Sequence, residues 1–384
     1  MPQITPDVEA FARIKVFGCG GSGKNALNHM INSKVKGVEF IAINTDAQDL
    51  HNTLAKKKIH IGKNLTRGLG TGMNPDIGKR AAEETREEIQ EAIKGADMVF
   101  IAGGEGGGTF TGSAPIVAKT AKEMGALTVA VTTKPFFFEG AQRLRFADVG
   151  LDELRKVVDA IIVIPNDRIL STISKETTAK AAFAMCDDIL RQAVEGISDL
   201  ITTPGIINLD FADIRSILEN AGSALIGIGS ATGEKRAEEA AKIAINSPLL
   251  ELSINGAKGV LFSIAGGDDL TMFEIQDAAK VITESIDPNA KVIFGTIKDE
   301  KLKKGEVKIT VIASGFPDGA KSKPLFAAEK SSGGDEKGRI FNTILPGSGG
   351  KDAKPQQPAE EKKVLTDMDD DWGAVPAFLR RAKK

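Results

Sequence analysis

Two glycine-rich stretches carry the groups best suited to chemistry. The first, residues 18–25, reads Gly-Cys-Gly-Gly-Ser-Gly-Lys-Asn, and the second, residues 103–112, reads Gly-Gly-Glu-Gly-Gly-Gly-Thr-Phe-Thr-Gly. Each follows a short apolar run and precedes a helical pattern, so the free N–H groups of a helix start face whatever binds there. Such groups bind anions, and two of these loops on one sheet suit a triphosphate that backbone donors grip from both sides.

The first stretch by itself also fits a dinucleotide site. Gly18, Gly20 and Gly23 match the GxGxxG pattern, which expects an acidic residue about 20 residues later at the end of the second strand. Glu39 begins that strand and Asp46 lies past it. A tight strand-to-helix turn without a ligand is a further alternative, but a NAD site does not need the second stretch, which favours the triphosphate.

The same residues nearly match the phosphate-binding loop GxxxxGK followed by Ser or Thr. Asn25 stands where that loop needs a hydroxyl to ligate Mg²⁺, so the match lacks its metal ligand. Between the two stretches, residues 68–75 form another loop of small residues that includes Gly72. We expect this loop to close over the terminal phosphate.

The loops need a parallel sheet to hold them. Short apolar runs alternate with helical patterns from residue 13 to residue 165, which predicts βαβ units. The expected strands are residues 14–17, 40–43, 98–102, 127–131 and 161–164. Each run ends in a polar or glycine-rich loop, and open α/β sheets bind ligands at the carboxyl ends of their strands.

Beyond this sheet, residues 178–202 place apolar side chains at helical spacing and predict one long, largely buried helix. Helical patterns at 210–219 and 233–246, followed by strand-like runs at 259–264, 292–297 and 307–313, predict a second α+β domain. We therefore predict an α/β fold with the following parts: 1–12 extension, 13–177 nucleotide-binding domain, 178–203 central helix, 204–314 α+β domain, 315–365 flexible linker, 366–384 terminal peptide.

Composition indicates an ordinary soluble protein. Of the 384 residues, 41% are hydrophobic and 27% charged, and the net charge of −2 gives no strong field for nucleic acid or a membrane surface. The two cysteines, Cys19 and Cys186, lie far apart without a CxxC partner, which disfavours a disulfide framework or a zinc site. No apolar run has the length of a signal or membrane segment, so we expect a cytoplasmic protein without membrane insertion.

The end of the chain combines a linker with a docking motif. Residues 315–365 are rich in Gly, Ser, Lys, Asp and Pro, and a coil of that composition spans on the order of 40 Å, so it can tether but not position. After it, acidic residues precede Trp372, Pro376, Phe378 and Leu379. Apolar anchors with charged flanks favour a partner-binding peptide over a frayed terminus.

The order of these motifs resembles the FtsZ family of tubulin-type, cell-division GTPases. Residues 104–115 are similar to its GGGTGTG signature, and further segments match in family order: Asn44-Thr45-Asp46, Thr133 to Phe136, Phe138-Glu139-Gly140, Ile164 to Asp167, Asn208 to Asp213 and Pro376 to Leu379. The resemblance covers residues 13 to about 315 and the terminal peptide.

The resemblance implies a GTP site with Mg²⁺ as companion of the nucleotide and without a metal site built by the protein. Glu139 and Arg143 would contact ribose and phosphate, Phe183 would stack on the base, and Asp187 would accept N1–H and N2–H of guanine. Without the resemblance, Glu139 and Arg143 are better interpreted as a surface i,i+4 ion pair, and a simple exposed helix acid is the alternative for Asp187. The full set of binding candidates is Gly20, Gly21, Ser22, Gly23, Lys24, Asn25, Asp46, Gly72, Gly107, Gly108, Thr109, Phe110, Thr111, Glu139, Arg143, Asn166, Phe183 and Asp187.

The resemblance also implies catalysis between subunits. Asp210 and Asp213, after Asn208, would project into the nucleotide site of the next subunit and polarise the attacking water, although acids in a first helical turn are usually caps. We therefore expect a head-to-tail homopolymer that hydrolyses GTP at its subunit junctions. It would scaffold the midcell division ring and bind membrane-tethering and regulatory proteins through the peptide around Phe378.

One residue departs from the family pattern. Phe110 replaces the glycine between the two threonines of the signature, where it could crowd the nucleotide or point away into the packing. Two alternatives to this function remain open. One is an FtsZ-like scaffold that binds nucleotide with impaired hydrolysis, and the other is a NAD-dependent oxidoreductase based on the first loop alone.

Overall fold

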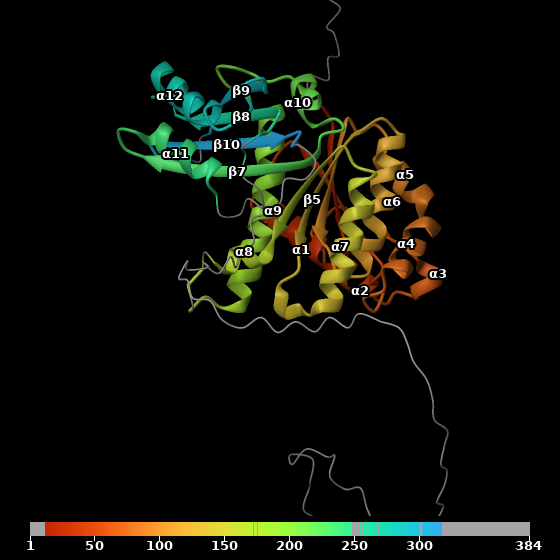
Figure 1. Cartoon of the computed structure of the whole chain (residues 1–384). Coiled ribbons are helices and arrows are strands. Elements are labelled where there is room, and N and C mark those ends of the chain that lie inside the picture. The colour runs from red at the N-terminus through yellow and green to blue at the C-terminus, as the bar shows by residue number, and fades with distance from the viewer. Residues whose placement is uncertain are drawn as a thin grey trace, which may run out of the picture. The chain divides into compact units, whose positions relative to one another are not determined.

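The computed structural model describes residues 12–316 except 172, 175, 248–253, 255, 268 and 300–301. The extension before Ala12, the linker beyond Phe316 and the terminal peptide lie outside the described residues. Within them, the strands form one ten-stranded sheet in the order β3-β2-β1-β4-β5-β6-β7-β10-β8-β9 (Figure 1).

The bounds of the elements follow in chain order. The strands are β1 (Ile14–Cys19), β2 (Val38–Asn44), β3 (Lys57–His60), β4 (Met98–Gly104), β5 (Leu127–Lys134), β6 (Ala160–Pro165), β7 (Gly222–Thr232), β8 (Gly259–Gly266), β9 (Lys291–Lys298) and β10 (Glu306–Ser314). The helices are α1 (Gly20–Asn32), α2 (Ala47–His51), α3 (Lys63–Thr66), α4 (Pro75–Glu84), α5 (Arg86–Ile93), α6 (Thr109–Glu123), the 3₁₀ turn η1 (Phe137–Glu139), α7 (Ala141–Arg155), α8 (Asn166–Leu170), α9 (Ala179–Thr202), α10 (Phe211–Leu218), α11 (Arg236–Ile245) and α12 (Met272–Thr283).

The predicted parallel sheet is confirmed. Strands β3, β2, β1, β4, β5, β6 and β7 pair in parallel, while β10 runs antiparallel to β7 and β8. Because neighbouring residues of a strand face opposite sides, Val16 and Phe17 belong to different cores. One core packs α1, α9 and α10 on the sheet, and the other packs α4, α5, α6 and α7 on the opposite face.

The sequence did not predict β3, β7 or α12. Strand β7 begins right after α10 and pairs with β6 at three positions, so the strands assigned to two domains share one sheet. Its glycines hide the strand pattern. A Cβ atom on Gly227 would lie 2.0 Å from the Ala244 carbonyl oxygen, and one on Gly229 would lie 2.1 Å from that of Ala240, so α11 can pack on β7 only where side chains are missing.

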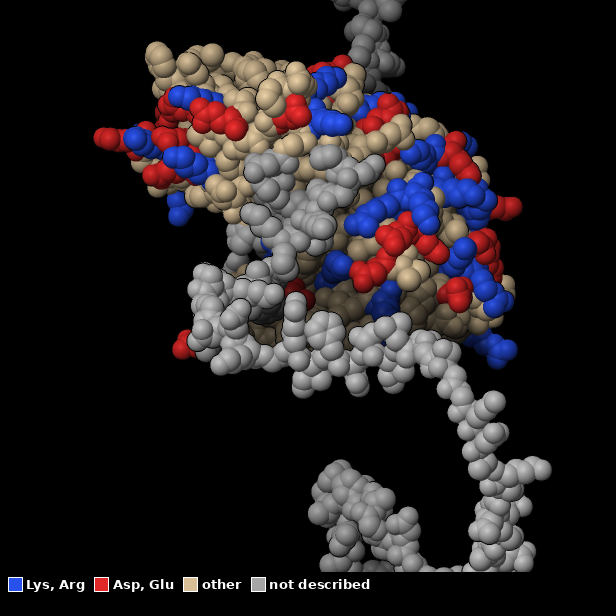
Figure 2. All heavy atoms as spheres, viewed as in Figure 1, with Lys and Arg blue, Asp and Glu red and all other residues tan. Residues whose placement is uncertain are grey.

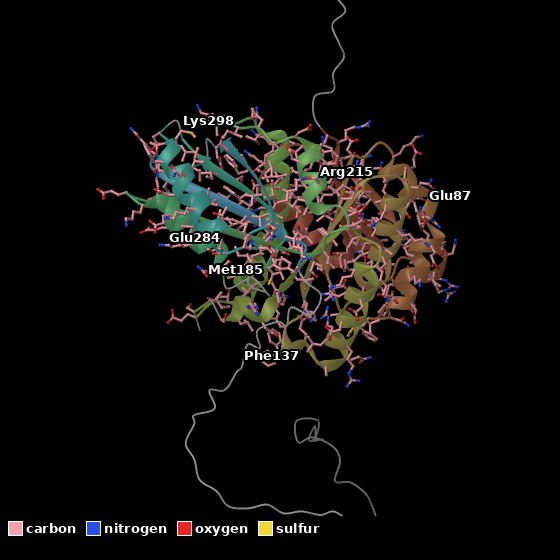
Figure 3. The ribbon with its side chains drawn as sticks, turned by 45° about the horizontal axis from the view of Figure 1, so that its top comes forward. Glu87, Phe137, Met185, Arg215, Glu284 and Lys298 are labelled. Atoms are coloured by element: carbon pink, nitrogen blue, oxygen red, sulfur yellow. The ribbon has the colours of Figure 1, made fainter. Side chains whose placement is uncertain are left out.

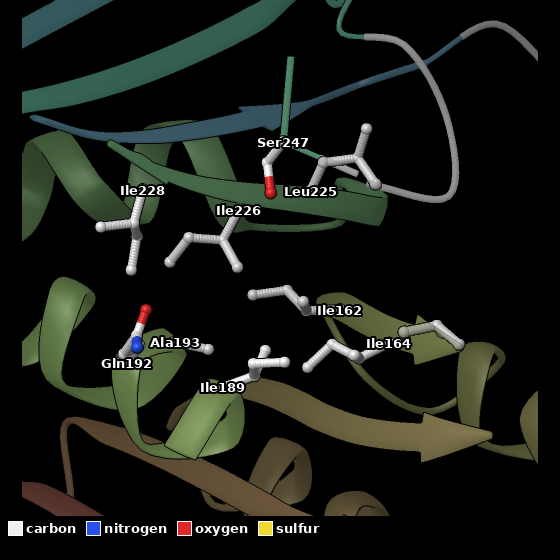
Figure 4. A pocket seen from close by; sticks show the side chains of 10 residues that line it. Ile162, Ile164, Ile189, Gln192, Ala193, Leu225, Ile226, Ile228 and Ser247 are labelled. Atoms are coloured by element: carbon white, nitrogen blue, oxygen red, sulfur yellow. The ribbon is translucent and has the colours of Figure 1, made fainter. Parts of the chain in front are cut away.

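Helix α9 is the long, largely buried helix that the periodicity of residues 178–202 predicted, and it connects the two halves. Its 24 residues span about 36 Å, and its buried face contacts α1, β5 and β9. Where α9 passes beneath β6 and β7, a cavity is lined mainly by apolar side chains, among them Ile162, Ile189, Ala193 and Ile226 (Figure 4). No helix in the described part of the chain is long and apolar enough to span a bilayer.

The visible surface carries both charge signs side by side (Figure 2). Oppositely charged side chains pair across elements, for example Arg86 with Glu123 at 2.5 Å and Lys63 with Glu88 at 3.0 Å. On this face, acidic and basic groups are therefore interspersed, and neither sign covers it alone.

Candidate functional site

The first glycine loop opens α1 directly at the carboxyl end of β1. Gly20 has φ +71°, a conformation that other residues rarely adopt, and it turns the chain from strand to helix. No side chain caps the start of α1 and its first turn holds no acidic residue, so its first N–H groups are available to an anion. Gly21, Ser22 and Asn25 are exposed around this start, and Gly23 is buried against the carbonyl of Ala102.

The second glycine loop meets the first. The Gly104 N–H group donates to Ser22 Oγ at 2.7 Å, and a Cβ atom on Gly20 would lie 3.3 Å from Thr109 Cβ. Helix α6 begins at Thr109, one turn earlier than the predicted start near Ser113, and no side chain caps it. A Cβ atom on Gly107 would meet nothing within 4 Å, so this residue borders open space. Two uncapped helix starts therefore converge, as the triphosphate hypothesis requires.

The loop of residues 68–75 lies against the second glycine loop. A Cβ atom on Gly108 would lie 2.1 Å from Thr71 Oγ1, which excludes any larger residue at position 108. Gly72 is exposed with φ +60° and open space around it. The loop is thus beside the expected phosphates, where it could cover them.

Lys24 is held by a residue that the sequence analysis missed. Its Nζ atom forms an ion pair with Asp49 Oδ1, and Asn44 Nδ2 donates to Asp49 Oδ2 at 2.8 Å. Asp46 caps α2 by accepting from the Asp49 N–H group at 2.9 Å. Asp49 follows Asp46 by three residues in α2, close to the end of β2, so a search at the carboxyl ends of the strands could have found it.

Glu139 and Arg143 form the i,i+4 ion pair that their spacing allows, at 2.7 Å. Glu139 Oε1 also accepts from the Phe136 N–H group at 2.9 Å. Arg143 lies beside the second glycine loop, because a Cβ atom on Gly106 would be 2.9 Å from Arg143 Cγ. Its buried Nε atom has no partner, nor has Oδ1 of the buried Asn166 at the end of β6. Unpartnered buried polar atoms are costly, and a polar ligand would satisfy them.

Phe183 and Asp187 lie on α9, close to the loop after β5. Phe183 is 48% exposed and packs edge to face on Phe136 at 5.5 Å, while Phe138 stacks on the same ring at 5.0 Å. Burial raises the pKa of Asp187 to about 6, although the charge of His29 opposes the shift. An exposed ring and a partly desolvated carboxylate thus stand one helical turn apart.

Phe110 does not face the loop surface. Its side chain is buried in the core between the sheet and α6, against Gly103, where a Cβ atom would lie 2.2 Å from Phe110 Cδ2. Thr111 is buried too, and its Oγ1 atom accepts from the Gly106 N–H group at 2.9 Å. Of these two binding candidates, neither side chain lines the site. Thr111 shapes the loop, and Phe110 fills the space beneath it.

The three catalytic candidates lie at the other end of the sheet. Asn208 accepts from the Gly205 N–H group at 2.7 Å, and Asp213 accepts from the Asp210 N–H group at 3.2 Å in a capping contact. Helix α10 is fixed by Arg215, which donates to the Gly125 carbonyl at 2.8 Å, just before β5 begins.

The glycine loops follow the carboxyl ends of the neighbouring strands, and the eight residues of β5 span about 26 Å. Figure 1 accordingly shows α10 at the opposite end of the sheet from α2 and α8, and Figure 3 separates Arg215 from Phe137 in the same way. Asp210 and Asp213 therefore cannot reach the glycine loops of their own chain.

Comparisons with known proteins agree with the resemblance. A model described as the Tubulin/FtsZ family, GTPase domain, matches residues 13–175, and one described as the FtsZ family, C-terminal domain, matches residues 222–317. A solved FtsZ dimer from M. jannaschii is 47% identical over 79% of this chain and 88% of that chain, with a TM-score of 0.75.

More distant structures share the fold. CetZ2 from Haloferax volcanii, described as a GTPgS-bound protofilament, is 20% identical over 78% of this chain and 92% of that chain, with a TM-score of 0.67. Family models cover both halves, and the M. jannaschii relative spans most of the chain. The chain therefore belongs to the FtsZ family, and its amino-terminal part, which contains both glycine loops, is a GTPase domain of the Tubulin/FtsZ type.

Proposed function

We propose that this protein polymerises head to tail and hydrolyses GTP at the junction between stacked subunits. The observation that carries the proposal is the separation of the two halves of the site. The glycine loops stand at the carboxyl ends of the strands, whereas Asp210 and Asp213 stand at the amino end of β5. A second copy stacked along the sheet brings its acids to the first copy's phosphates.

In this proposal each group of residues has one task. Backbone N–H groups of residues 20–25 and 107–109 hold the phosphates, and Glu139 and Arg143 contact ribose and phosphate. Phe183 and Asp187 bind guanine, and Asn166 contributes its free Oδ1 atom. Mg²⁺ typically binds through substrate phosphates and water, so it would enter with the nucleotide and neutralise its charge. The acids of the next copy then orient the attacking water.

Apolar surfaces at both ends support the stacking. At the end of the sheet that carries Asp210 and Asp213, Ile206 and Phe273 are 81% and 79% exposed, and Ile206 lines a surface pocket together with Leu270. At the end of the glycine loops, Phe137 and Phe138 are 66% and 59% exposed. Large apolar side chains gathered on a surface favour contact with another protein. The M. jannaschii relative is described as a dimer and CetZ2 as a protofilament.

The dependence of GTP turnover on protein concentration tests this proposal. If neighbouring subunits share each active site, phosphate release per subunit should rise steeply with concentration and follow polymer mass in a sedimentation assay. A rate per subunit that stays constant down to concentrations without polymer would refute the shared site.

The cellular part of the proposal concerns the division ring. We propose a cytoplasmic scaffold at midcell, which the peptide around Pro376, Phe378 and Leu379 tethers to membrane-bound and regulatory proteins. This peptide lies outside the described residues and the proposal for it rests on the sequence. A chain without residues 366–384 should polymerise and hydrolyse GTP normally in solution but fail to localise at midcell.

The alternative of a scaffold with impaired hydrolysis rested on Phe110 crowding the nucleotide. The buried position of its ring beneath the loop removes that steric reason. The NAD alternative rested on the first loop alone. Because the second glycine loop meets the first, and a NAD site does not need that second loop, the arrangement favours a triphosphate over NAD. We therefore retain the polymerising GTPase.

The proposed role of Asp187 predicts a change of base preference. Asp187→Asn should weaken GDP binding by about 10- to 100-fold, because hydrogen bonds to charged groups contribute about 1.5–3 kcal/mol. It should favour xanthosine diphosphate, whose O2 atom can accept from the new amide. Calorimetry with both nucleotides tests this. Asp188→Asn is the matched control, since Asp188 accepts from His29 and Arg191 instead and should not change the preference.

The same role predicts a pH effect of defined sign. Only the ionised Asp187 can accept both N1–H and N2–H, so GDP affinity should fall as the pH drops through the pKa of about 6. Asp187→Asn should lack this acidic decline. An unchanged decline in the variant would assign it to another group.

A further inference from the structure

Glu105 lies inside the second glycine loop and has no apparent task. Its side chain is 3% exposed, and neither carboxyl oxygen has a hydrogen-bond partner. Its backbone is fixed, because the Glu105 N–H group donates to the Thr133 carbonyl at 2.9 Å. A buried charged carboxylate without a partner is strongly unfavourable, so the acid must either bind a proton or find a cation.

The fold makes room for this carboxyl group. A Cβ atom on Gly150 of α7 would lie 2.5 Å from Glu105 Oε2 and 2.4 Å from Thr111 Cγ2. The glycine thus allows the acid to pack directly on the backbone of α7, beside the threonine that accepts from Gly106. The carboxyl group is therefore part of the packing that shapes the loop.

The surrounding charges do not stabilise an anion there. On α7, Arg143 pairs with Glu139, Asp152 pairs with Arg155, and Asp148 pairs with Lys134 of β5. Strand β4 has no charged residue, and the charged residues of α6 begin at Lys119, about 12 Å along the helix from Thr111. Burial raises the pKa of Glu105 to about 8, and the charge of Glu153 raises it further.

Glu105 lies so close to the expected phosphates that its protonation state should affect nucleotide binding. Glu105 precedes Gly107 by two residues, so their Cα atoms lie at most about 7 Å apart. An ionised carboxylate this close to a bound diphosphate or triphosphate repels it in a weakly screened site. It would also draw solvent or a cation into the packing against Gly150.

We propose that Glu105 is a positioning residue that shapes the second glycine loop as a neutral acid, so that loss of its proton weakens nucleoside-phosphate binding at alkaline pH. The proposal deepens the proposed function and rests on nucleotide binding at this loop. The pH dependence of nucleotide binding would then come from the Glu105 side chain, because the backbone N–H donors do not titrate in this range.

The test is the affinity for fluorescent N-methylanthraniloyl-GDP from pH 6.5 to pH 9, below the concentration of assembly. If only the neutral form binds, the apparent Kd of the wild type should rise about tenfold between pH 7 and pH 9. Glu105→Gln, which keeps the shape without the charge, should bind like the wild type at pH 7 and lack this rise. Parallel curves for the two proteins, or a folded variant that does not bind at pH 7, would overturn the proposal.

A second variant keeps the test valid if Glu105→Gln does not fold. Glu153→Gln removes an exposed charge that raises the pKa of Glu105, so the alkaline rise should begin at a lower pH. A rise at the same or a higher pH would contradict the proposal. Failure of the shared site would instead appear as concentration-independent GTP turnover with the pH dependence of GDP binding intact.

Discussion

Alanine at Asp210 or Asp213 is expected to lower GTP turnover by about 10²- to 10³-fold, the range for losing one preorganised group at a transition state. GDP affinity of the free subunit should stay unchanged. The two acids lie at the opposite end of the sheet from their own glycine loops, so they touch no nucleotide bound to the same chain. Single-turnover phosphate release and GDP titration measure the two quantities separately.

The capping contact requires a control. Asp213 accepts from the Asp210 N–H group, and removal of a cap costs about 1 kcal/mol. Asp213→Asn keeps an oxygen that can accept from the Asp210 N–H group but has no carboxylate, so it should melt like the wild type and still lose turnover. Activity in the asparagine variant but not in the alanine variant would identify a structural role.

Mixing two inactive variants tests the shared site directly. Gly107→Asp has open space for its side chain, so it should fold while placing a carboxylate at the phosphate cradle. Asp210→Ala keeps an intact cradle, and Gly107→Asp keeps intact acids. Junctions that combine the two should hydrolyse GTP, so the mixture should recover a substantial fraction of wild-type turnover. A mixture as inactive as its components, despite copolymerisation, would contradict catalysis in trans.

The central part of the fold could be predicted because its strands are short, mostly apolar runs. Strands β1, β2, β4, β5 and β6 all show this pattern, as buried parallel strands do. Strand β7 could not be predicted in the same way, since its glycines accommodate α11, a partner that no local pattern identifies. The edge strand β3 reads Lys-Lys-Ile-His, too short and polar to differ from a loop.

The candidate site shows the same division. Loops that follow parallel strands lie at one edge of the sheet, so the pattern predicted that the two glycine loops share an edge. The pairing of β1 with β4 then brings Gly20 next to Thr109. Pairings between side chains did not follow from the pattern. Asp49 of α2 pairs with Lys24 of α1, and the direction of Phe110 depends on the missing side chain of Gly103 in β4. Such contacts are set by packing between elements, which the spacing within one element does not reveal.

That packing gives the second large prediction, a stability coupling between Gly103 and Phe110. Gly103→Ala would place Cβ 2.2 Å from the Phe110 ring and 3.0 Å from the Cys19 carbonyl oxygen, and such overpacking typically costs 1–3 kcal/mol. Phe110→Gly removes a buried ring, a loss of about 3–5 kcal/mol for similar truncations. Both single variants should therefore unfold at lower denaturant concentration, measured without nucleotide.

The double variant decides whether the two residues are coupled. With the ring gone, the alanine methyl group fills part of the vacated space, so the double variant should be more stable than the sum of the single losses by about 0.5–3 kcal/mol. Gly107→Ala, in the same loop but with no neighbour within 4 Å of the added atom, should change the free energy of unfolding little. If the losses at 103 and 110 simply add, Phe110 is not held in place by the glycine beside it. The tolerance of a phenylalanine in this glycine loop would then need another cause.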